Sequence, residues 1–467
     1  MARFRKTYLQ YMEELFAKAT IDCNHSSIET TLAWYIAKHG IFHLLILDDK
    51  ENAKKCLLDI YFVANFRTLW KDSPNTLAPI RYVGVQNMRD AYYAQIALFV
   101  DVVATEKMAL AAKDTAIFLR DIGLYDVGLE YVDWAYKVLK TQKGVNSLET
   151  LLVGTELALF CSLQGNTQKA LGLLTTILEQ QEISLGPEHP STLKTAHVLA
   201  GVYSDIDNEE AEVLYIRTLT GRESVLGKIH PDTLVSVSDL ARLYLHQQKY
   251  ADAEALTLRF IQGRTEIFGS EHLYTKMGLH NLAVVYLEQQ QYSKAEELFT
   301  SVLPWYKTIL GRLHPSTLNV IYNIGYLYEQ LQEYHKAEEL YTEELDGIVQ
   351  TMGWGHPYTK EALDSLFGLY MNLQRYEEVS SLYYRVIEGL EQEKGENDTL
   401  VLNYIHSFAR WNDRLGRYDE AEKLYIVVYQ RKTNIYGSKH IQTIDAAMNV
   451  KFLQQKKQQR ATNSNIQ

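Results

Sequence analysis

Hydrophobic residues follow the period of an α-helix along most of this 467-residue chain. The segment 275–316 shows the pattern most clearly, because two apolar stripes at helical spacing are separated by the short polar turn QQQY. The stripe positions are Leu279, Leu282, Ala283 and Tyr286 in the first half, and Ala295, Leu298, Phe299 and Val302 in the second. The pattern predicts two antiparallel helices joined by a tight turn.

The same unit recurs along the chain, marked by a glycine at intervals of 41 or 42 residues. The set is Gly144, Gly186, Gly227, Gly269, Gly311, Gly353, Gly395 and Gly437. We expect each glycine to adopt a left-handed conformation that ends the second helix of its unit. In the sequence that follows Gly311, Pro315 suits a first helical turn, and Ser316 and Thr317 can accept hydrogen bonds from free amides.

Other residue types keep the same period. Counted from Thr275, an alanine falls eight places on and a tyrosine eleven places on in most units. A second tyrosine falls seventeen places on, and a second alanine falls twenty places on. The third unit lacks one residue, and Val379 replaces the second alanine of the seventh unit. A single helical pair cannot bury its own apolar stripe, so the units must stack on one another.

The small–aromatic–alanine pattern resembles the tetratricopeptide repeat, and the 42-residue length with junctions such as LGRLHPSTL is similar to the repeats of kinesin light chains. The resemblance implies an all-α fold, a right-handed superhelical solenoid of about eight antiparallel helix pairs. We expect four parts: a helical cap over 1–107, eight repeats over 108–442, a capping helix over 443–460 with a Lys/Gln-rich exposed side, and a disordered tail over 461–467.

Residues 1–107 have helical spacing but lack the repeat. Phe42-His43-Leu44 and the later Leu57–Phe62 segment resemble the helical region that precedes the repeats in STAND-type NTPases of the nephrocystin and apoptosome-like group. No GxxxxGK[ST] phosphate-binding loop occurs in the sequence, so the NTPase itself is not expected. We interpret the segment as a cap on the solenoid.

Composition narrows the class of partner. The chain has 47 Lys and Arg against 58 Asp and Glu, a net charge of -11, which argues against nucleic acid or an anionic membrane as the main partner. Its three cysteines form no CxxC pair, and no apolar run approaches the roughly 18 residues of a membrane span. We therefore expect a cytoplasmic protein without membrane insertion.

Enzymatic chemistry is not indicated. Six of the fourteen histidines fall at the junctions between units. Successive junctions of a solenoid lie roughly 20 Å apart, so these side chains cannot share one metal ion and are expected to be structural. The sequence contains no HExxH motif and no nucleophile elbow. The prediction is no catalytic residue, no metal and no cofactor; an enzyme with a site between cap and solenoid is the alternative.

The resemblance also implies a binding surface. In tetratricopeptide arrays, places two, five, six, nine and twelve to thirteen of each first helix line the inner groove. Carried onto this chain, these places give the candidate peptide-binding residues Arg242, His280, Asn281, Asn319, Tyr322, Asn323 and Tyr326.

Asn281 and Asn323 match the place-six asparagines that grip the backbone of an extended cargo peptide in kinesin light chains. An amide both donates and accepts, so it can pair with any peptide backbone. Tyr322 and Tyr326 offer flat apolar area. The alternative is that all these side chains merely line a solvated groove. Lys113 and Lys194 lie in units without a groove asparagine, which argues against capture of a C-terminal carboxylate.

The sequence thus predicts a non-enzymatic scaffold that binds an extended peptide segment of a partner protein. The alternatives are a kinesin light chain-like cargo adaptor, or the sensor arm of a STAND-type NTPase that has lost its NTPase module.

Overall fold

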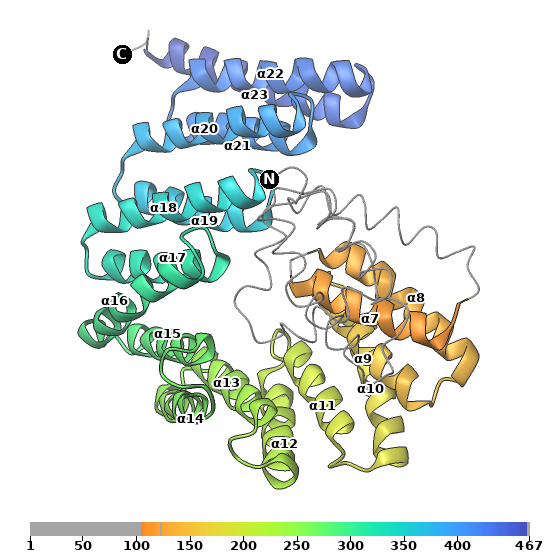
Figure 1. Cartoon of the computed structure of the whole chain (residues 1–467). Helices are drawn as coiled ribbons and strands as arrows, with labels where there is room; N and C mark the ends of the chain where they lie inside the picture. Colours follow the sequence, from red (N-terminus) through yellow and green to blue (C-terminus); the bar gives the residue numbers. More distant parts are fainter. Residues whose placement is uncertain (1–103, 122–123, 465–467) are drawn as a thin grey trace, which may run out of the picture. The chain divides into compact units, whose positions relative to one another are not determined.

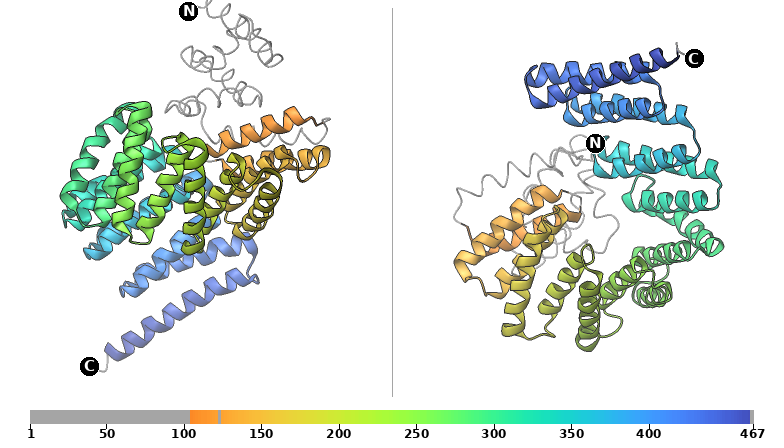
Figure 2. Two further views of the ribbon diagram at one scale, coloured as in Figure 1. Left: turned by 90° about the horizontal axis from the view of Figure 1, so that it is seen from below. Right: turned by 180° about the vertical axis from the view of Figure 1, so that it is seen from behind.

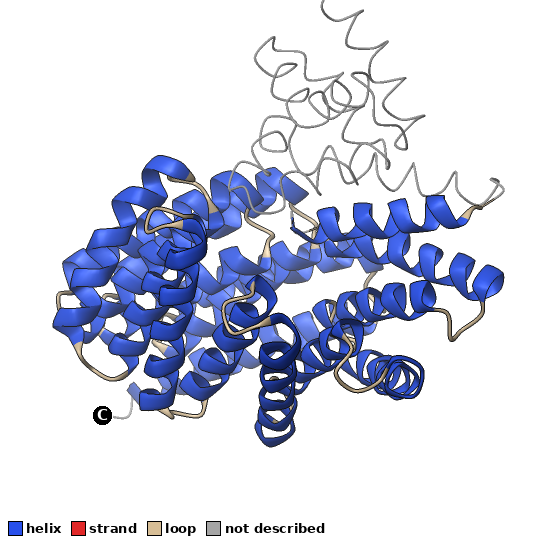
Figure 3. Cartoon of the chain, turned by 60° about the horizontal axis from the view of Figure 1, so that its bottom comes forward, coloured by secondary structure: helices blue, strands red, loops and turns tan. Residues whose placement is uncertain are grey.

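A computed structural model describes residues 104–121 and 124–464. All regular structure in these residues is helical, and no strand occurs among them (Figure 3). The all-α repeat solenoid predicted from the sequence is confirmed. The predicted cap, 1–107, lies outside the described residues except for its last four positions, and so do the segments that resemble STAND-type NTPases.

The chain divides into two compact units between Gln289 and Gln290, and each unit is described here by itself. In the first unit every helix packs against the next one along the chain. Its helices are α7 (Glu106–Asp121), α8 (Tyr125–Lys143), α9 (Leu148–Leu163), α10 (Thr167–Leu185), α11 (Pro190–Tyr203), α12 (Asn208–Leu226), α13 (Pro231–His246), α14 (Tyr250–Phe268) and α15 (Leu273–Glu288).

The second unit continues the pattern of helix pairs in chain order, as the views in Figures 1 and 2 show. Its helices are α16 (Tyr292–Ile309), α17 (Pro315–Gln330), α18 (Tyr334–Met352), α19 (Pro357–Asn372), α20 (Tyr376–Lys394), α21 (Thr399–Arg414), α22 (Tyr418–Tyr436) and α23 (Ile441–Ser464). The boundary between the units falls inside the fifth repeat, so its two helices belong to different units.

Six of the described hairpin turns contain one residue with a positive φ; the turn of the third repeat, with Ile206 at this place, has none. The positive-φ residue is a glutamine in four repeats and a glycine in two others, always twenty-one residues before the junction glycine. Around Gln332, the amide of Glu333 donates to the carbonyl of Tyr328 at 2.8 Å, which is the long bond of a Schellman motif. The turn around Gln332 is therefore a helix C-cap in which a glutamine holds the left-handed position, and Gln290 of the QQQY turn has the same φ of about 60°.

The junction glycines all have a positive φ, between 83 and 94°. Their ψ values differ from the left-handed conformation that we expected: Gly144 has a ψ of 166° and Gly353 a ψ of 171°. This region of backbone space is essentially restricted to glycine. The structural demand for glycine at the junction is thus stricter than an ordinary helix cap would impose.

The histidines of the junctions cap the following helices. In six junctions the ring Nδ1 accepts a hydrogen bond from the backbone amide two residues later, at 3.0–3.3 Å. The six are His189, His230, His272, His314, His356 and His440. Their predicted structural role at the junctions is confirmed by this geometry.

The roles expected of Ser316 and Thr317 were wrong. The Ser316 amide donates to His314, while the Thr317 hydroxyl donates to the carbonyl of Gly311 at 2.8 Å. Thr233, Thr275 and Thr359 make the same bond to their own junction glycines. The imidazole is the acceptor at the start of the helix, and the buried threonine satisfies a carbonyl at the end of the preceding helix.

The periodic tyrosines connect successive repeats. The hydroxyls of Tyr328 and Tyr370 each donate at 2.9 Å to a glutamate on the second helix of the preceding repeat, Glu296 and Glu338 respectively. In the first unit Tyr286 bonds Glu254 in the same way at 3.2 Å. The high tyrosine content therefore reflects ring packing with a fixed hydrogen bond between repeats.

The last helix, α23, extends to Ser464, so the predicted boundary at residue 460 falls within it. Lys456 and Lys457 pair with Asp413 and Glu422 of the neighbouring helices, so part of the lysine-rich sequence serves packing. The exposed face that we expected to be polar also carries an apolar stripe. Its members are Ile441, Ile444, Met448 and Phe452.

Candidate peptide-binding groove

Four of the predicted groove residues lie on one face of α17. Asn319 is exposed, whereas Tyr322, Asn323 and Tyr326 are half-buried. The opposite face carries buried apolar side chains, so packing fixes the rotation of the helix. The Asn323 amide nitrogen lies 2.9 Å from the Asn319 carbonyl and 3.3 Å from its side-chain oxygen, which orients the amide along the helix.

Tyr322 connects this face to the neighbouring helices. Its ring centroid lies 5.9 Å from that of Tyr341 on α18. Burial raises the pKa of Tyr322, as does the nearby Glu344 carboxyl, while a hydrogen bond with Ser365 of α19 acts in the opposite direction. The phenol is therefore neutral at physiological pH and lies between its own helix and the first helix of the next repeat.

Glu344 is a residue that our sequence reasoning missed. It belongs to α18 and is 8% exposed, and among the residues that the structure describes its Oε2 atom has no hydrogen-bond partner. Burial raises its pKa to about 8, and the negative charge of Glu361 on α19 acts in the same direction. A comparison of the repeats position by position could have found it, because the other repeats have an uncharged residue there.

The first unit holds the remaining three candidates, Arg242, His280 and Asn281. Arg242 is exposed on α13 and lies 3.7 Å from Asp239. Asp239 in turn contacts the Nε2 atom of His197 on α11 at 3.0 Å. Burial opposes ionisation of Asp239, but its hydrogen bond to His197 and the charges of His197 and Arg242 outweigh this and lower its pKa. Arg242 is thus part of a polar chain between first helices.

His280 and Asn281 are adjacent on α15. Burial lowers the pKa of His280 to about 4, although its hydrogen bond with Asn281 works the other way. The imidazole is neutral at pH 7, so this part of the face offers an amide and a neutral ring. Asn281 and Asn323, predicted as a pair, belong to different units.

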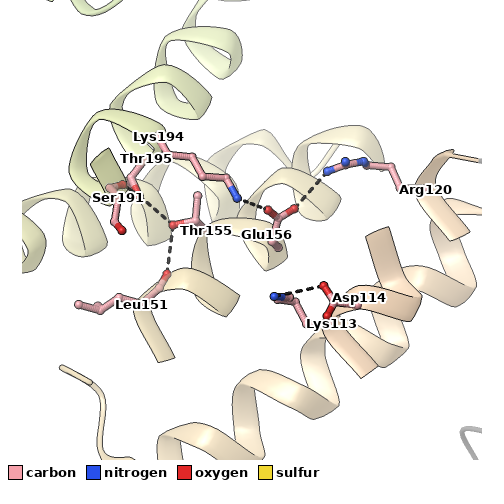
Figure 4. A network of polar contacts seen from close by, with 9 residues as sticks. All are labelled: Lys113, Asp114, Arg120, Leu151, Thr155, Glu156, Ser191, Lys194 and Thr195. Carbon is pink, nitrogen blue, oxygen red and sulfur yellow. Dashed lines mark hydrogen bonds and ion pairs between the residues drawn. The ribbon is translucent and has the colours of Figure 1, made fainter. Parts of the chain in front are cut away.

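Ion pairs occupy the groove positions of the first three repeats (Figure 4). Glu156 of α9, at the place-six position, receives Lys194 at 2.7 Å and Arg120 at 3.1 Å. Burial opposes ionisation of Glu156, yet the two cations hold its pKa below the usual value. Beside it, the Thr155 and Thr195 hydroxyls are 2.9 Å apart.

These contacts bear on the possible capture of a C-terminal carboxylate. Lys194 is paired with Glu156, and Lys113 lies 3.2 Å from Asp114. Both lysines that could bind a carboxylate therefore already have acidic neighbours within the chain. In the second unit an uncharged pair at groove places connects two first helices: the Nε2 atom of His406 on α21 and the Nδ2 atom of Asn449 on α23 are 3.2 Å apart.

Metal-binding clusters and membrane-spanning helices are both absent from the described residues. No cluster of three or more His, Cys, Asp or Glu side chains with metal-binding geometry occurs in 104–121 or 124–464. Within the same residues, no helix combines the length and hydropathy needed to cross a membrane.

The comparison with known families matches the repeat seen in the structure. One model of the tetratricopeptide repeat matches residues 146–224, 232–308 and 274–347, and a second model of this repeat matches 401–442. Together the matched ranges cover just over half of the chain. The chain belongs to the tetratricopeptide repeat family. No curated protein matches it significantly by sequence.

Solved structures with a similar fold come from several kinds of protein. Nearly identical TPR-like repeats from Podosopora anserina, provisionally designated a kinesin light chain, share 24% identity with a TM-score of 0.38, over 44% of this chain and 98% of that one. The apo quorum sensor NprR from B. thuringiensis shares 16% identity with a TM-score of 0.44, over 87% and 99%. A STAND protein with a tetratricopeptide repeat sensor, from Pyrococcus horikoshii, shares 13% identity with a TM-score of 0.43, over 79% and 54%.

Proposed function

We propose that this tetratricopeptide repeat protein is a non-enzymatic scaffold that binds an extended peptide segment of a partner protein on the groove face of its first helices. The observation that carries the proposal is the face of α17. There, Asn319, Tyr322, Asn323 and Tyr326 place two amides and two aromatic rings on neighbouring turns, none of them fully buried.

The chemistry of this face suits a peptide backbone. A carboxamide offers both a donor and an acceptor, so it can bond a backbone amide and carbonyl whatever the side chains of the ligand. The tyrosine rings add apolar area with little loss of conformational entropy. The face of the first three repeats differs, because its charged side chains are satisfied within the chain. We therefore place the peptide on the later repeats.

A selection from a library of random peptides of about 12 residues, displayed against the full chain, tests this proposal. The affinities of the selected peptides are then measured by calorimetry for the wild type, Asn323→Ala, and the double variant Asn281→Ala/Asn323→Ala. We expect the affinity to fall about tenfold for Asn323→Ala, since each lost hydrogen bond costs about 1–2 kcal/mol. The double variant should bind more weakly still.

Asn434→Ala is the matched control, because it removes the same amide from an exposed position on α22, a second helix. Its affinity should equal that of the wild type, and thermal melts should show that all variants remain folded. Unchanged affinity in the double variant would refute the groove assignment. A failure to select any peptide would refute the proposed function.

A further inference from the structure

The repeats can be compared at one buried position, nine residues before each junction glycine. Seven of the eight repeats have an uncharged residue there, and each is at most 5% exposed. These residues are Ala135, Ile177, Thr218, Phe260, Val302, Val386 and Val428. The sixth repeat has Glu344. The position belongs to the core of the solenoid, and only the sixth repeat places an ionisable group in it.

A carboxylate at such a position is costly to the fold. Transfer of an unpaired charge from water into the interior costs several kcal/mol, and a buried oxygen without a hydrogen bond adds to the penalty. Among residues 104–121 and 124–464, the buried Oε2 atom of Glu344 has no hydrogen-bond partner. Burial therefore raises the pKa of the carboxyl to about 8, and ionisation at pH 7 requires a cation beside it. Among the described residues, no lysine or arginine pairs with it. Valine, as in the next two repeats, would fill this position without the penalty.

The surroundings of Glu344 are groove positions. Glu361, at the second groove place of α19, is close enough for its negative charge to raise the pKa of Glu344. Glu344 in turn raises the pKa of Tyr322, at the fifth groove place of α17, and of Tyr341, on which the Tyr322 ring packs. Asp364, at the fifth groove place of α19, is exposed, and its negative charge raises the pKa of Tyr383 and Tyr404. The Tyr322 ring packs on Tyr341, which precedes Glu344 by about one turn on α18, so the carboxyl lies close to these groove positions.

We propose that Glu344 is the recognition group for a basic side chain: the peptide that binds this groove presents a lysine or arginine at Tyr322, and its cation pairs with the Glu344 carboxylate. This inference rests on the proposed function and adds a partner class to it. The aliphatic stem of a lysine or arginine packs well on a tyrosine ring, and the cation supplies the partner that the buried oxygen lacks. The exposed carboxyl groups of Glu361 and Asp364 on α19 attract the same cation as it approaches Glu344.

The peptide selection described above also tests this inference, with Glu344→Val and Glu344→Gln beside the wild type. Valine is the residue of the next two repeats, so Glu344→Val should fold and melt at a higher temperature than the wild type. Peptides selected on the wild type should share a lysine or arginine at one fixed position. Their affinity should fall at least tenfold on both variants, and on wild type when that residue is replaced by norleucine or citrulline.

Glu339→Gln is the control, because it removes an exposed carboxyl from the same helix. It should leave affinity and preference unchanged. Selected peptides without a basic preference, or equal affinity for Glu344→Val, would overturn this inference while the Asn323 result still decides the proposed function. A lower melting temperature for Glu344→Val would also overturn it, since the carboxyl would then serve the fold.

Discussion

At the scale of single residues, the hairpin turns show a local conflict between sequence and backbone. Gln248, Gln290, Gln332 and Gln374 have φ values of 56–61°. A residue with a Cβ atom is strained in this left-handed region by about 1 kcal/mol. Gly165 and Gly416 occupy the equivalent turns without that cost. The turn is therefore specified by its hydrogen bonds and by the helices on either side, rather than by the preference of glutamine.

Replacing one of these glutamines should stabilise the protein. We expect Gln332→Gly to raise the free energy of unfolding by about 0.5–1 kcal/mol, because the relief of left-handed strain exceeds the added entropy of the unfolded chain. Urea unfolding followed by circular dichroism measures the change. Gln330→Gly, inside the last turn of α17, is the control and should destabilise by a similar amount. Equal effects of the two variants would contradict the assignment of strain to Gln332.

Glu344 shows what comparison between repeats adds at this scale. A single glutamate in a helix is unremarkable in a sequence, and nothing around it suggests burial. Aligned with its seven counterparts, it becomes the exception to a core position. The sequence therefore contained the signal, but only the structure shows that the carboxyl is buried and that its Oε2 atom has no partner within the described part of the chain.

At the scale of the helix pair, the junction combines three contributions that recur with the repeat. The glycine turns the chain, the threonine hydroxyl bonds the glycine carbonyl, and the imidazole caps the next helix. The seventh junction uses Asp398 as the cap instead, whose carboxylate accepts from the Leu400 amide at 2.7 Å. Histidine and aspartate both accept the capping hydrogen bond. They differ in pKa, because an imidazole gains a proton at about pH 6.5 whereas an aspartate does so only at about pH 4.

This difference predicts a dependence of stability on pH. Burial lowers the pKa of His356, and its Nδ1 atom must be unprotonated to accept from Tyr358. Its contribution to stability is complete above the unfolded pKa of about 6.5 and is lost as the pH falls through the lower folded pKa. Between about pH 7.5 and 5, the wild type should lose about 1 kcal/mol more than His356→Asp, whose cap stays ionised. Unfolding in urea at a series of pH values would show it, and parallel curves for the two proteins would contradict it.

At the scale of the whole molecule, each helix packs chiefly against its neighbours in the chain. Stability in such an array is roughly a sum of terms for single repeats and their interfaces. The contacts that cross from one repeat to the next are specific, as the tyrosine–glutamate bonds show. A local change should therefore have a local effect.

Truncation of a buried tyrosine tests this expectation. Tyr425, in α22, is 6% exposed and packs with Ala409 and Leu453. Tyr425→Ala should cost about 3 kcal/mol and reduce hydrogen-exchange protection in α21–α23, with little change in α9–α12. Tyr215→Ala, at the equivalent position of α12, should have the reverse effect. A uniform loss of protection along the described helices in either variant would show that the array unfolds as one cooperative body.

The sequence alone determined the repeat, because tandem units repeat their apolar stripes, turn residues and junction glycines at one period, and such local signals suffice to specify helix pairs. It also indicated which helix face would hold the candidate site, through its resemblance to the tetratricopeptide repeat. The tertiary structure decided which of the candidate groups are paired within the chain. Charges at the groove places of the early repeats neutralise one another across helices that are about 40 residues apart in the chain, whereas Glu344 is buried with an oxygen that no described residue bonds. Such pairing depends on distances between side chains of different repeats, and only the packed chain fixes these distances.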